Sequence, residues 1–223
     1  MRNKKFRRIT GIVLGTKDVS EGDKVVVVFS PELGKYNLMA YGANRFKSRF
    51  SNRTNTSNVI QGWVRFPQGL NKIPSLENAE VLVNFFDELK NNYLKLFSAN
   101  IASEIINLVV PQEVFDQELY DTTIKFFSKL IESENEEDSF LTLSKFLILL
   151  LKIQGVLPYI KEEKEIEPTT KFFILSLLKD SKPGKDVDTS VKLDFLEWFE
   201  RKLSKITNER KIISIQLLKR VIK

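Results

Sequence analysis

The 223-residue sequence contains no cysteine and no histidine. Without cysteine there can be no disulfide and no thiolate metal site, and without histidine Ser-His-Asp and Cys-His catalysis are excluded. The phosphate-binding patterns GxxxxGK and GxGxxG are also missing, which argues against a nucleotide hydrolase. An enzyme would have to work with Asp, Glu, Lys, Ser, Thr or Tyr alone, and nuclease chemistry, which the residue types leave open, would need two or three clustered carboxylates to hold Mg²⁺. Because the basic part of the chain has few acids, we expect no cofactor, no metal and no small-molecule substrate, and we interpret the protein as a non-enzyme.

Long apolar runs are lacking as well. The longest, at residues 146–151, is bracketed by Lys145 and Lys152 and is far shorter than the ~20 residues of a membrane span. The N-terminus has charges followed by an apolar run, as a signal peptide does, but the run at residues 9–15 is interrupted and no small-residue cleavage site follows it. We expect a soluble, cytoplasmic protein with no membrane partner.

Acidic residues are scarce in the first third of the chain, and none lies between Glu32 and Glu77. Residues 1–80 hold 14 Lys and Arg against 6 Asp and Glu, a balance of +8. Residues 81–223 hold 21 against 23, a balance of −2. Such an asymmetry indicates that the first part has an anionic partner, either nucleic acid or a membrane surface.

The first 80 residues have the alternation and the turn signals of five short strands. We expect these strands at about residues 6–16, 24–30, 35–41, 59–67 and 73–83. Gly11 and Gly15 mark kinks or bulges in the first of them. Five short strands with one long loop predict a small closed barrel, either the oligonucleotide-binding (OB) fold or a barrel of the SH3 type.

From residue 87 onward the apolar period changes from 2 to 3.6, which predicts helices. We expect one helix ended by Pro111, a second at about 115–131, and a central helix at about 139–154 with Gly155 as its C-cap. A charged linker at 161–167 and three more helices follow. The predicted fold class is α+β, with a five-stranded OB-fold β-barrel domain at residues 1–80 and an all-helical domain at residues 81–223.

Three groups of residues allow a structural and a functional interpretation. Asp18, Glu21 and Asp23 could hold a metal ion, as could the acidic run at 132–138, but the first set has a turn-like setting and the run has no defined ligand spacing. We interpret them as a structural turn and a solvated connector. Five phenylalanines of the middle helices are interpreted as core rather than as a ligand site: Phe115, Phe126, Phe127, Phe140 and Phe146.

The stretch at residues 41–53, YGANRFKSRFSNR, carries four cations interleaved with two phenylalanines. Cations there would neutralise phosphates and rings would stack on bases, although the stretch could also be a solvated loop whose two phenylalanines anchor it to the core. The basic arm at residues 2–8 is a competing contributor. The predicted nucleic-acid-binding residues are Lys35, Tyr41, Arg45, Phe46, Lys47, Arg49, Phe50 and Arg53.

Several segments share an order and spacing with a known family. They are GIVL at 11–14, SEGDK at 20–24, FSPELGK at 29–35, YGANRFKSR at 41–49, LENAE at 76–80, and a helix ending in Gly-x-x-Pro at 146–158. Together they resemble the bacterial recombination-mediator family RecO. Many members follow the last segment with a four-cysteine zinc hairpin. This chain has a short charged linker there, so it resembles a zinc-free, shortened member.

The resemblance implies an OB barrel that binds single- and double-stranded DNA and anneals complementary strands, in a nucleoid-associated protein. It also implies partnership with RecR and with single-stranded-DNA-binding protein, so that recombinase is loaded during DNA repair. The residues themselves leave a second hypothesis open, a protein-interaction adaptor whose basic barrel docks an acidic protein or an anionic surface. A salt-sensitive gel shift with a single strand would separate the two.

Overall fold

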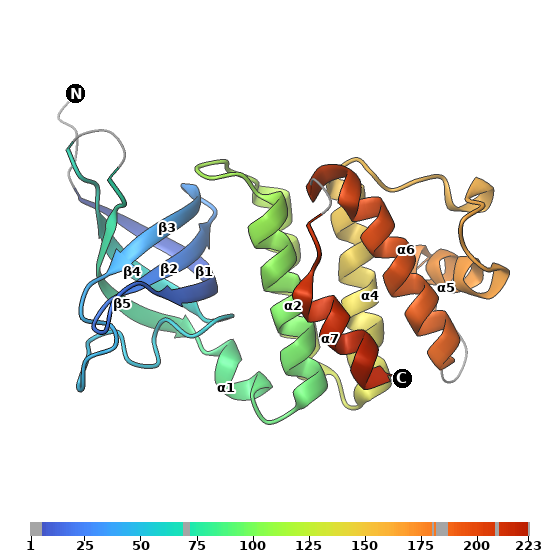
Figure 1. The fold of residues 1–223 in the computed structure, drawn as a ribbon, viewed down its shortest axis with the longest axis horizontal. Helices are drawn as coiled ribbons and strands as arrows, with labels where there is room; N and C mark the ends of the chain where they lie inside the picture. The colour runs from blue at the N-terminus through green and yellow to red at the C-terminus, as the bar shows by residue number, and fades with distance from the viewer. Residues whose placement is uncertain (1–5, 69–71, 180, 182–186, 208–209, 223) are drawn as a thin grey trace. The chain divides into compact units, whose positions relative to one another are not determined.

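The computed structural model describes residues 6–68, 72–179, 181, 187–207 and 210–222. Its first part closes into a barrel with the strand order β1-β2-β3-β5-β4 (Figure 1). Neighbouring strands are antiparallel except β3 and β5, which are parallel. This order confirms the predicted OB-like barrel. The strands are β1 (Phe6–Asp18), β2 (Lys24–Ser30), β3 (Gly34–Ala40), β4 (Val59–Arg65) and β5 (Ser75–Val83).

The long strand β1 closes the barrel because it pairs with β4 through its first half and with β2 through its second. Its register against β2 shifts between Val13 and Gly15, which confirms the irregularity predicted there. At Gly11 an added β-carbon would lie 2.6 Å from the carbonyl oxygen of Phe29. Only glycine therefore lets the two backbones approach this closely.

The barrel interior is filled by alternate side chains of the strands, as the two-residue period of a strand requires. One large member comes from outside the strands, because Phe50 of the loop after β3 is only 1% exposed and lies in this core. The buried set is Ile9, Val13, Val26, Val28, Leu38, Ala40, Phe50, Ile60, Val64, Leu76 and Ala79.

The end of β2 and the beginning of β3 are covered on their outer side by residues 106–120, which belong to the same compact unit as the barrel. The ring of Phe29 packs edge-on against Tyr120 with 5.7 Å between centroids. The backbone N–H of Glu113 donates to the carbonyl of Lys35 at 2.9 Å. OB folds commonly bind their ligands on this face of strands 2 and 3. Here the chain itself occupies the part of that face around Phe29 and Lys35, whereas Asn37 and Tyr41 stay exposed.

Helices make up the rest of the described chain (Figure 1). Part of α2 belongs to the barrel unit, while residues 92–105 and the described residues from Asp121 onward form a second compact unit. The helices are α1 (Phe85–Leu89), α2 (Tyr93–Val109), α3 (Gln117–Glu132), α4 (Glu136–Ile153), the 3-10 turn η1 (Ile160–Glu162), α5 (Pro168–Leu178), α6 (Thr189–Thr207) and α7 (Ile213–Ile222).

The long apolar helix α4 is buried along most of its length, as predicted for a central helix. It ends at Gly155, which has φ +68. The N–H of Val156 donates to the carbonyl of Leu151 at 2.9 Å, and the N–H of Gly155 to that of Lys152 at 3.0 Å. These two bonds define a Schellman ending, so the predicted role of Gly155 is confirmed.

Four of the five phenylalanines expected in the helical core are buried, namely those at 126, 127, 140 and 146. The prediction is wrong for Phe115, which is 55% exposed. It lies in the connection before α3, outside the helical period that suggested its burial.

Two boundaries differ from those predicted. The helix expected from residue 87 to Pro111 is divided into α1 and α2, and the side chain of Asn92 caps the second by accepting from the N–H of Lys95 at 3.0 Å. The last three residues of the acidic run at 132–138 are the first turn of α4 rather than a connector, with Asn135 as its N-cap. Carboxylates are stabilising there because they face the positive end of the helix dipole.

Among the described residues, no group of three or more His, Cys, Asp or Glu is placed to hold a metal ion. No described helix combines the length and the apolarity that crossing a bilayer requires. That residues 1–80 and 81–223 are separate domains remains a prediction.

Candidate nucleic-acid interface

The basic loop at residues 41–58 joins β3 to β4 and is built from successive tight turns. The N–H groups of Arg45, Ser48, Ser51 and Arg53 each donate to the carbonyl three residues earlier, at 3.0 to 3.2 Å. Several of the loop's backbone N–H groups are thus paired within the loop itself. The segment has a defined course although it contains neither helix nor strand.

The β1–β2 turn braces the beginning of this loop. Asp23 accepts the N–H of Gly42 at 2.8 Å, and Asp18 accepts the side-chain amide of Asn44 at 2.9 Å. The backbone N–H of Asn44 also donates to the carbonyl of Gly22 at 3.1 Å. Asp18 and Asp23 therefore have the structural role predicted for their cluster.

Asn58, which is completely buried, fixes the end of the loop. Its side-chain amide donates to the carbonyl of Asn52 at 3.2 Å, and its side-chain oxygen accepts the N–H of Phe86 at 3.1 Å. Together with the ring of Phe50 in the barrel core, these contacts hold the loop at its beginning, middle and end.

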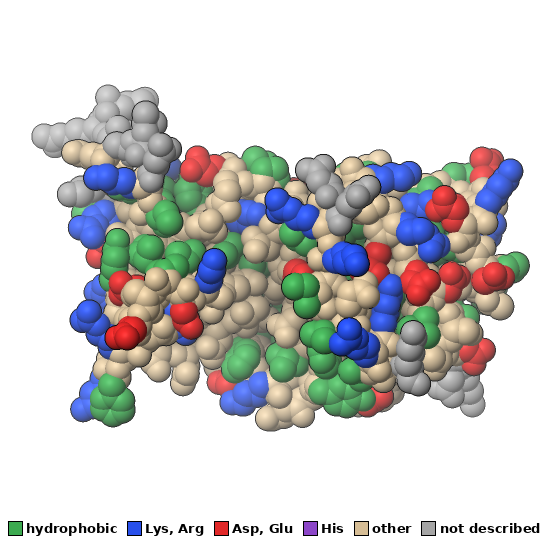
Figure 2. Space-filling model, in the orientation of Figure 1, with side chains coloured by type: hydrophobic (Ala, Val, Ile, Leu, Met, Phe, Trp, Pro, Cys, Tyr) green, Lys and Arg blue, Asp and Glu red, His purple; other side chains and the backbone are tan. Residues whose placement is uncertain are grey.

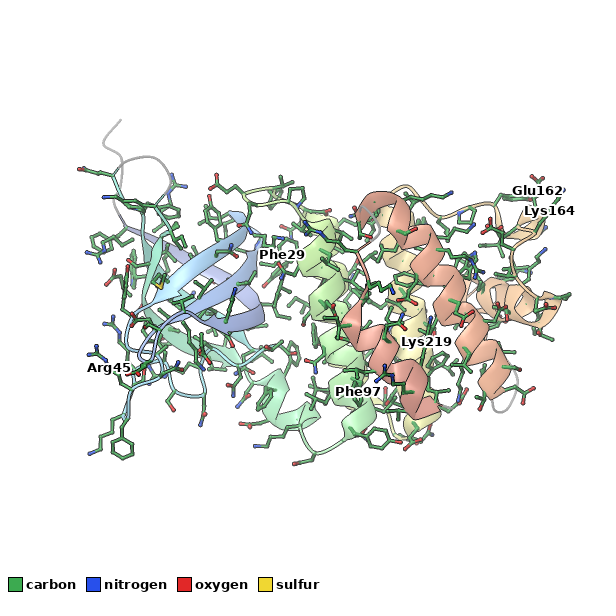
Figure 3. The ribbon with its side chains drawn as sticks, viewed as in Figure 1. Phe29, Arg45, Phe97, Glu162, Lys164 and Lys219 are labelled. Atoms are coloured by element: carbon green, nitrogen blue, oxygen red, sulfur yellow. The ribbon has the colours of Figure 1, made fainter. Side chains whose placement is uncertain are left out.

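Between these anchors the loop presents cations and one aromatic ring to solvent. Phe46 is 93% exposed, and Arg45, Lys47 and Arg49 are exposed around it. Figure 3 shows the Arg45 side chain extending away from the strands, and Figure 2 shows blue side chains gathered along this end of the barrel. Within the described part of the chain, none of these three cations forms an ion pair with a carboxylate.

Two other predicted residues are exposed with different surroundings. Tyr41, at the start of the loop, is 55% exposed. The guanidinium of Arg53 donates to the backbone carbonyl of Ala79 at 3.1 Å, so part of its hydrogen-bonding capacity is used within the barrel. Of the eight predicted residues, six are therefore accessible.

The prediction is wrong for Lys35 and Phe50. Lys35 is only 5% exposed because residues 106–120 cover β3, and its ammonium group donates to the carbonyl of Asn107 at 2.5 Å. Burial lowers the pKa of Lys35 below its ordinary value. Phe50 cannot stack on a base from inside the core. The anchoring role considered for both phenylalanines holds for Phe50 and not for Phe46.

The structure adds exposed residues that the sequence reasoning passed over. Trp63 of β4 is 46% exposed and stands opposite Arg8 of β1, both on the outer face of the barrel. Arg65, the last residue of β4, is also exposed, as is Lys72 in the connection to β5. The two-residue alternation of β4 is the signal that could have assigned Trp63 outward. Most of the basic arm, residues 1–5, lies outside the described residues.

Comparison with known proteins gives the family. The family model "Recombination protein O N terminal" matches residues 1–85. The chain is 30% identical over 154 residues to the DNA repair protein RecO of Caldanaerobacter subterraneus subsp. tengcongensis, covering 69% of this chain and 60% of that protein. The chain belongs to the RecO family. The suspected resemblance is confirmed.

Two further RecO relatives have similar extents. The DNA repair protein RecO of Oceanobacillus iheyensis is 26% identical over 157 residues, covering 70% of this chain and 58% of the relative. That of Mesoplasma florum is 29% identical over 154 residues, covering 66% and 54%. The chain thus spans somewhat more than half the length of the RecO relatives that it matches.

The charged linker of this RecO-family chain is held by ion pairs. Lys202 of α6 lies with its ammonium group 2.8 Å from a carboxylate oxygen of Glu163 and 2.8 Å from one of Glu165. Ile160 and Ile166 at the two ends of the linker are buried. Residues 160–167 are thus fixed to the helical unit by salt bridges and apolar contacts, in a sequence that has no cysteine for a zinc hairpin.

Proposed function

We propose that this RecO-family chain is a non-enzymatic DNA-binding mediator of recombinational repair, which binds single- and double-stranded DNA and anneals complementary strands. The observation that carries the proposal is the loop at 41–58, which holds Arg45, Lys47 and Arg49 in solvent around an exposed ring. Cations without carboxylate partners are available to phosphates, and binding them releases condensed counterions. The ring of Phe46 would stack on an unpaired base.

Annealing follows from the same chemistry. Two complementary strands repel each other through their phosphates, and cations that neutralise the phosphates lower this barrier. Contacts to phosphates and to base faces leave the pairing edges of most bases free. A protein that screens the backbone without covering those edges therefore accelerates duplex formation.

The partners belong to the proposal as well. As a RecO-family member the chain would act with RecR and with single-stranded-DNA-binding protein in loading recombinase. The basic barrel supplies the DNA contact in this scheme, and the helical unit offers further surface for proteins. The working site on the barrel would be the six accessible residues Tyr41, Arg45, Phe46, Lys47, Arg49 and Arg53.

The test removes three charges from the loop by replacing Arg45, Lys47 and Arg49 together with alanine. Affinity for a labelled strand of about 30 nucleotides is measured by gel shift or anisotropy at several salt concentrations. Loss of three phosphate contacts should flatten the slope of log affinity against log salt by about 2 for a single strand and nearly 3 for a duplex. The annealing rate of complementary labelled strands should fall in parallel.

The matched control removes three exposed lysines of the helical unit, Lys152, Lys164 and Lys205, and so changes net charge equally. Figure 3 shows Lys164 at the surface. The control should keep the original slope. Equal flattening in both variants would mean that general charge and not the loop matters, and a wild-type protein without any salt-sensitive shift would favour the adaptor hypothesis.

A further inference from the structure

A cleft of about 400 Å³ opens on the barrel where β3 meets β5. These two strands pair at a single position, Met39 with Ser75, and the N–H of Met39 donates to the carbonyl of Pro74 at 2.8 Å. Because the pairing does not continue, the side chains beyond it leave a hollow. Its lining consists of Met39, Tyr41, Arg65, Pro67, Lys72, Ile73 and Ser75.

The lining combines apolar and aromatic surface with positive charge. Tyr41 and Ile73 are 55% and 47% exposed, so both offer flat or apolar surface to a ligand. Arg65 and Lys72 add two cations, and none of the lining residues is acidic. A base needs an apolar or aromatic face, and its flanking phosphates need cations, so the lining has both parts of a nucleotide site.

The guanidinium of Arg65 is held in place by neighbours on β5. Its Nε lies 2.8 Å from a carboxylate oxygen of Glu77 and 3.3 Å from the hydroxyl oxygen of Ser75. This ion pair offsets part of the charge of Arg65 but also fixes its position at the edge of the cleft. Lys72 forms no ion pair within the described residues and so contributes an uncompensated charge.

Size and position indicate which nucleic acid fits. A volume of about 400 Å³ is near the lower end of the ~300–1,000 Å³ typical of small-ligand sites, which suits one nucleotide and is too small for a base pair with its backbones. Tyr41 belongs both to the cleft and to the beginning of the basic loop. The cleft and the basic loop therefore adjoin at Tyr41.

We propose that this cleft is a subsite for one unpaired nucleotide of a bound DNA strand. The base stacks on Tyr41 beside Met39 and Ile73, and Lys72 with Arg65 neutralises the phosphates on either side. The inference rests on the proposed function and adds a means of distinguishing single strands from duplexes. The loop attracts both, whereas the cleft admits only a base that is not paired.

The test replaces Tyr41 with leucine, which keeps apolar bulk and removes the ring. Affinities for a thymidine strand of about 30 nucleotides and for a duplex of equal length are compared. Single-strand affinity should fall by about 5- to 150-fold, the range for losing one stacked base, while duplex affinity should stay within about twofold. Lys72→Ala should reduce the single-strand salt slope by about 0.7.

Two control variants separate the ring from the fold. Tyr41→Phe keeps the stacking surface and should bind single strands as the original protein does. Tyr159→Leu removes a tyrosine that is 65% exposed in the helical unit and should change neither affinity. Unchanged single-strand binding by Tyr41→Leu, or equal losses for single strand and duplex, would overturn the subsite.

A strand containing 2-aminopurine reports stacking directly, since its fluorescence should be quenched by the original protein and much less by Tyr41→Leu. Equal quenching by both proteins would overturn the stacking role of Tyr41.

Free thymidine monophosphate serves as competitor, and binding as tight as that of the strand would make this a site for free nucleotides instead. If the three-alanine loop variant binds normally, the proposed loop fails. If only Tyr41→Leu binds normally, the subsite alone fails.

Discussion

Gly34 begins β3 in the left-handed region, with φ +80, and the backbone of the covering segment lies directly against it. An added β-carbon would lie 2.3 Å from the carbonyl oxygen of Val114, a distance that requires the backbone to move. Glycine at this position is therefore what allows residues 106–120 to lie on β3.

We predict that Gly34→Ala lowers the free energy of unfolding by about 2 kcal/mol or more, since it combines backbone strain with a steric clash. Gly15→Ala is the matched control, because a β-carbon there would meet no atom within 4 Å. Urea unfolding followed by circular dichroism measures both. Equal stability of the two variants would contradict the close packing at Gly34.

Residue type also did not determine whether each of the two loop phenylalanines is buried or exposed. Phe46 and Phe50 are four residues apart in the same basic context, yet one is 93% exposed and the other 1%. The succession of turns decides which ring enters the barrel core, and single-sequence patterns do not encode that succession. Lys35 was misjudged for a related reason, since a segment more than seventy residues later in the chain covers it.

Among the elements, α7 has no acidic residue in its first turn to complement its dipole. Glu104 of α2 supplies the charge from elsewhere in the same unit. Its two carboxylate oxygens accept the N–H of Ile213 at 2.8 Å and the N–H and hydroxyl of Ser214 at 2.9 and 2.5 Å. A side chain distant in sequence thus caps the helix.

We predict that Glu104→Ala destabilises the protein by about 1–2 kcal/mol, the usual effect of losing a helix cap, and speeds hydrogen exchange at Ile213 and Ser214. Glu104→Gln keeps a hydrogen-bond acceptor, so its stability should lie between that of the original protein and that of Glu104→Ala. Glu134→Ala, which removes an exposed carboxylate, is the control. Exchange at these two amides that does not change in Glu104→Ala would exclude the capping role.

The attachment of the linker at 160–167 depends on pH, because it rests on ion pairs of Lys202 with Glu163 and Glu165. Burial disfavours the charged form of Glu163, but hydrogen bonds from Lys202 and the N–H of Glu165 outweigh it and lower the pKa of Glu163 below its ordinary 4.5. Burial likewise opposes charge on Lys202, yet hydrogen bonds to Glu163 and Glu165 raise its pKa above its ordinary 10.5. The stabilisation is therefore complete between these two ordinary values. It is lost as pH falls through the lowered pKa or rises through the raised one.

We predict that Lys202→Met costs about 3 kcal/mol near pH 7, because it leaves the buried carboxylate of Glu163 without its partner. The difference from the original protein should shrink as pH falls from 4.5 through the lowered pKa of Glu163, where this carboxyl becomes protonated in the folded protein. Thermal unfolding at a series of pH values measures it, with Lys205→Met on the exposed side of α6 as control. A difference that is constant down to pH 2 would exclude the ion pair as the cause.

Strongly periodic elements were predictable, including all five strands and the central helix α4. The break between α1 and α2 was not, because the apolar stripe runs through it and only the capping bond of Asn92 marks the new start. The linker at 160–167 was expected to be a charged connector. Its charge pattern gives no sign that Lys202, forty residues later, is buried against it.

For the whole molecule, the change from a two-residue to a 3.6-residue period predicted the order of barrel and helices. The same pattern could not show that residues 106–120 join the barrel unit, since contacts between distant segments leave no periodic trace. The charge balance of +8 and −2 indicated that the barrel part is the basic one, and its attraction for polyanions remains a prediction. The balance did not predict which cations remain accessible. Lys35 was predicted to bind nucleic acid, but it is buried in the folded chain.

The anchored ring of Phe50 has a consequence for the energetics of association. A loop that must become ordered when its ligand arrives loses conformational entropy at that moment, which weakens the complex. Here that entropy is lost during folding, because the core, the β1–β2 turn and Asn58 already fix the course of the backbone. A polyanion would then meet a preorganised set of charges, and only the side chains would need to adjust.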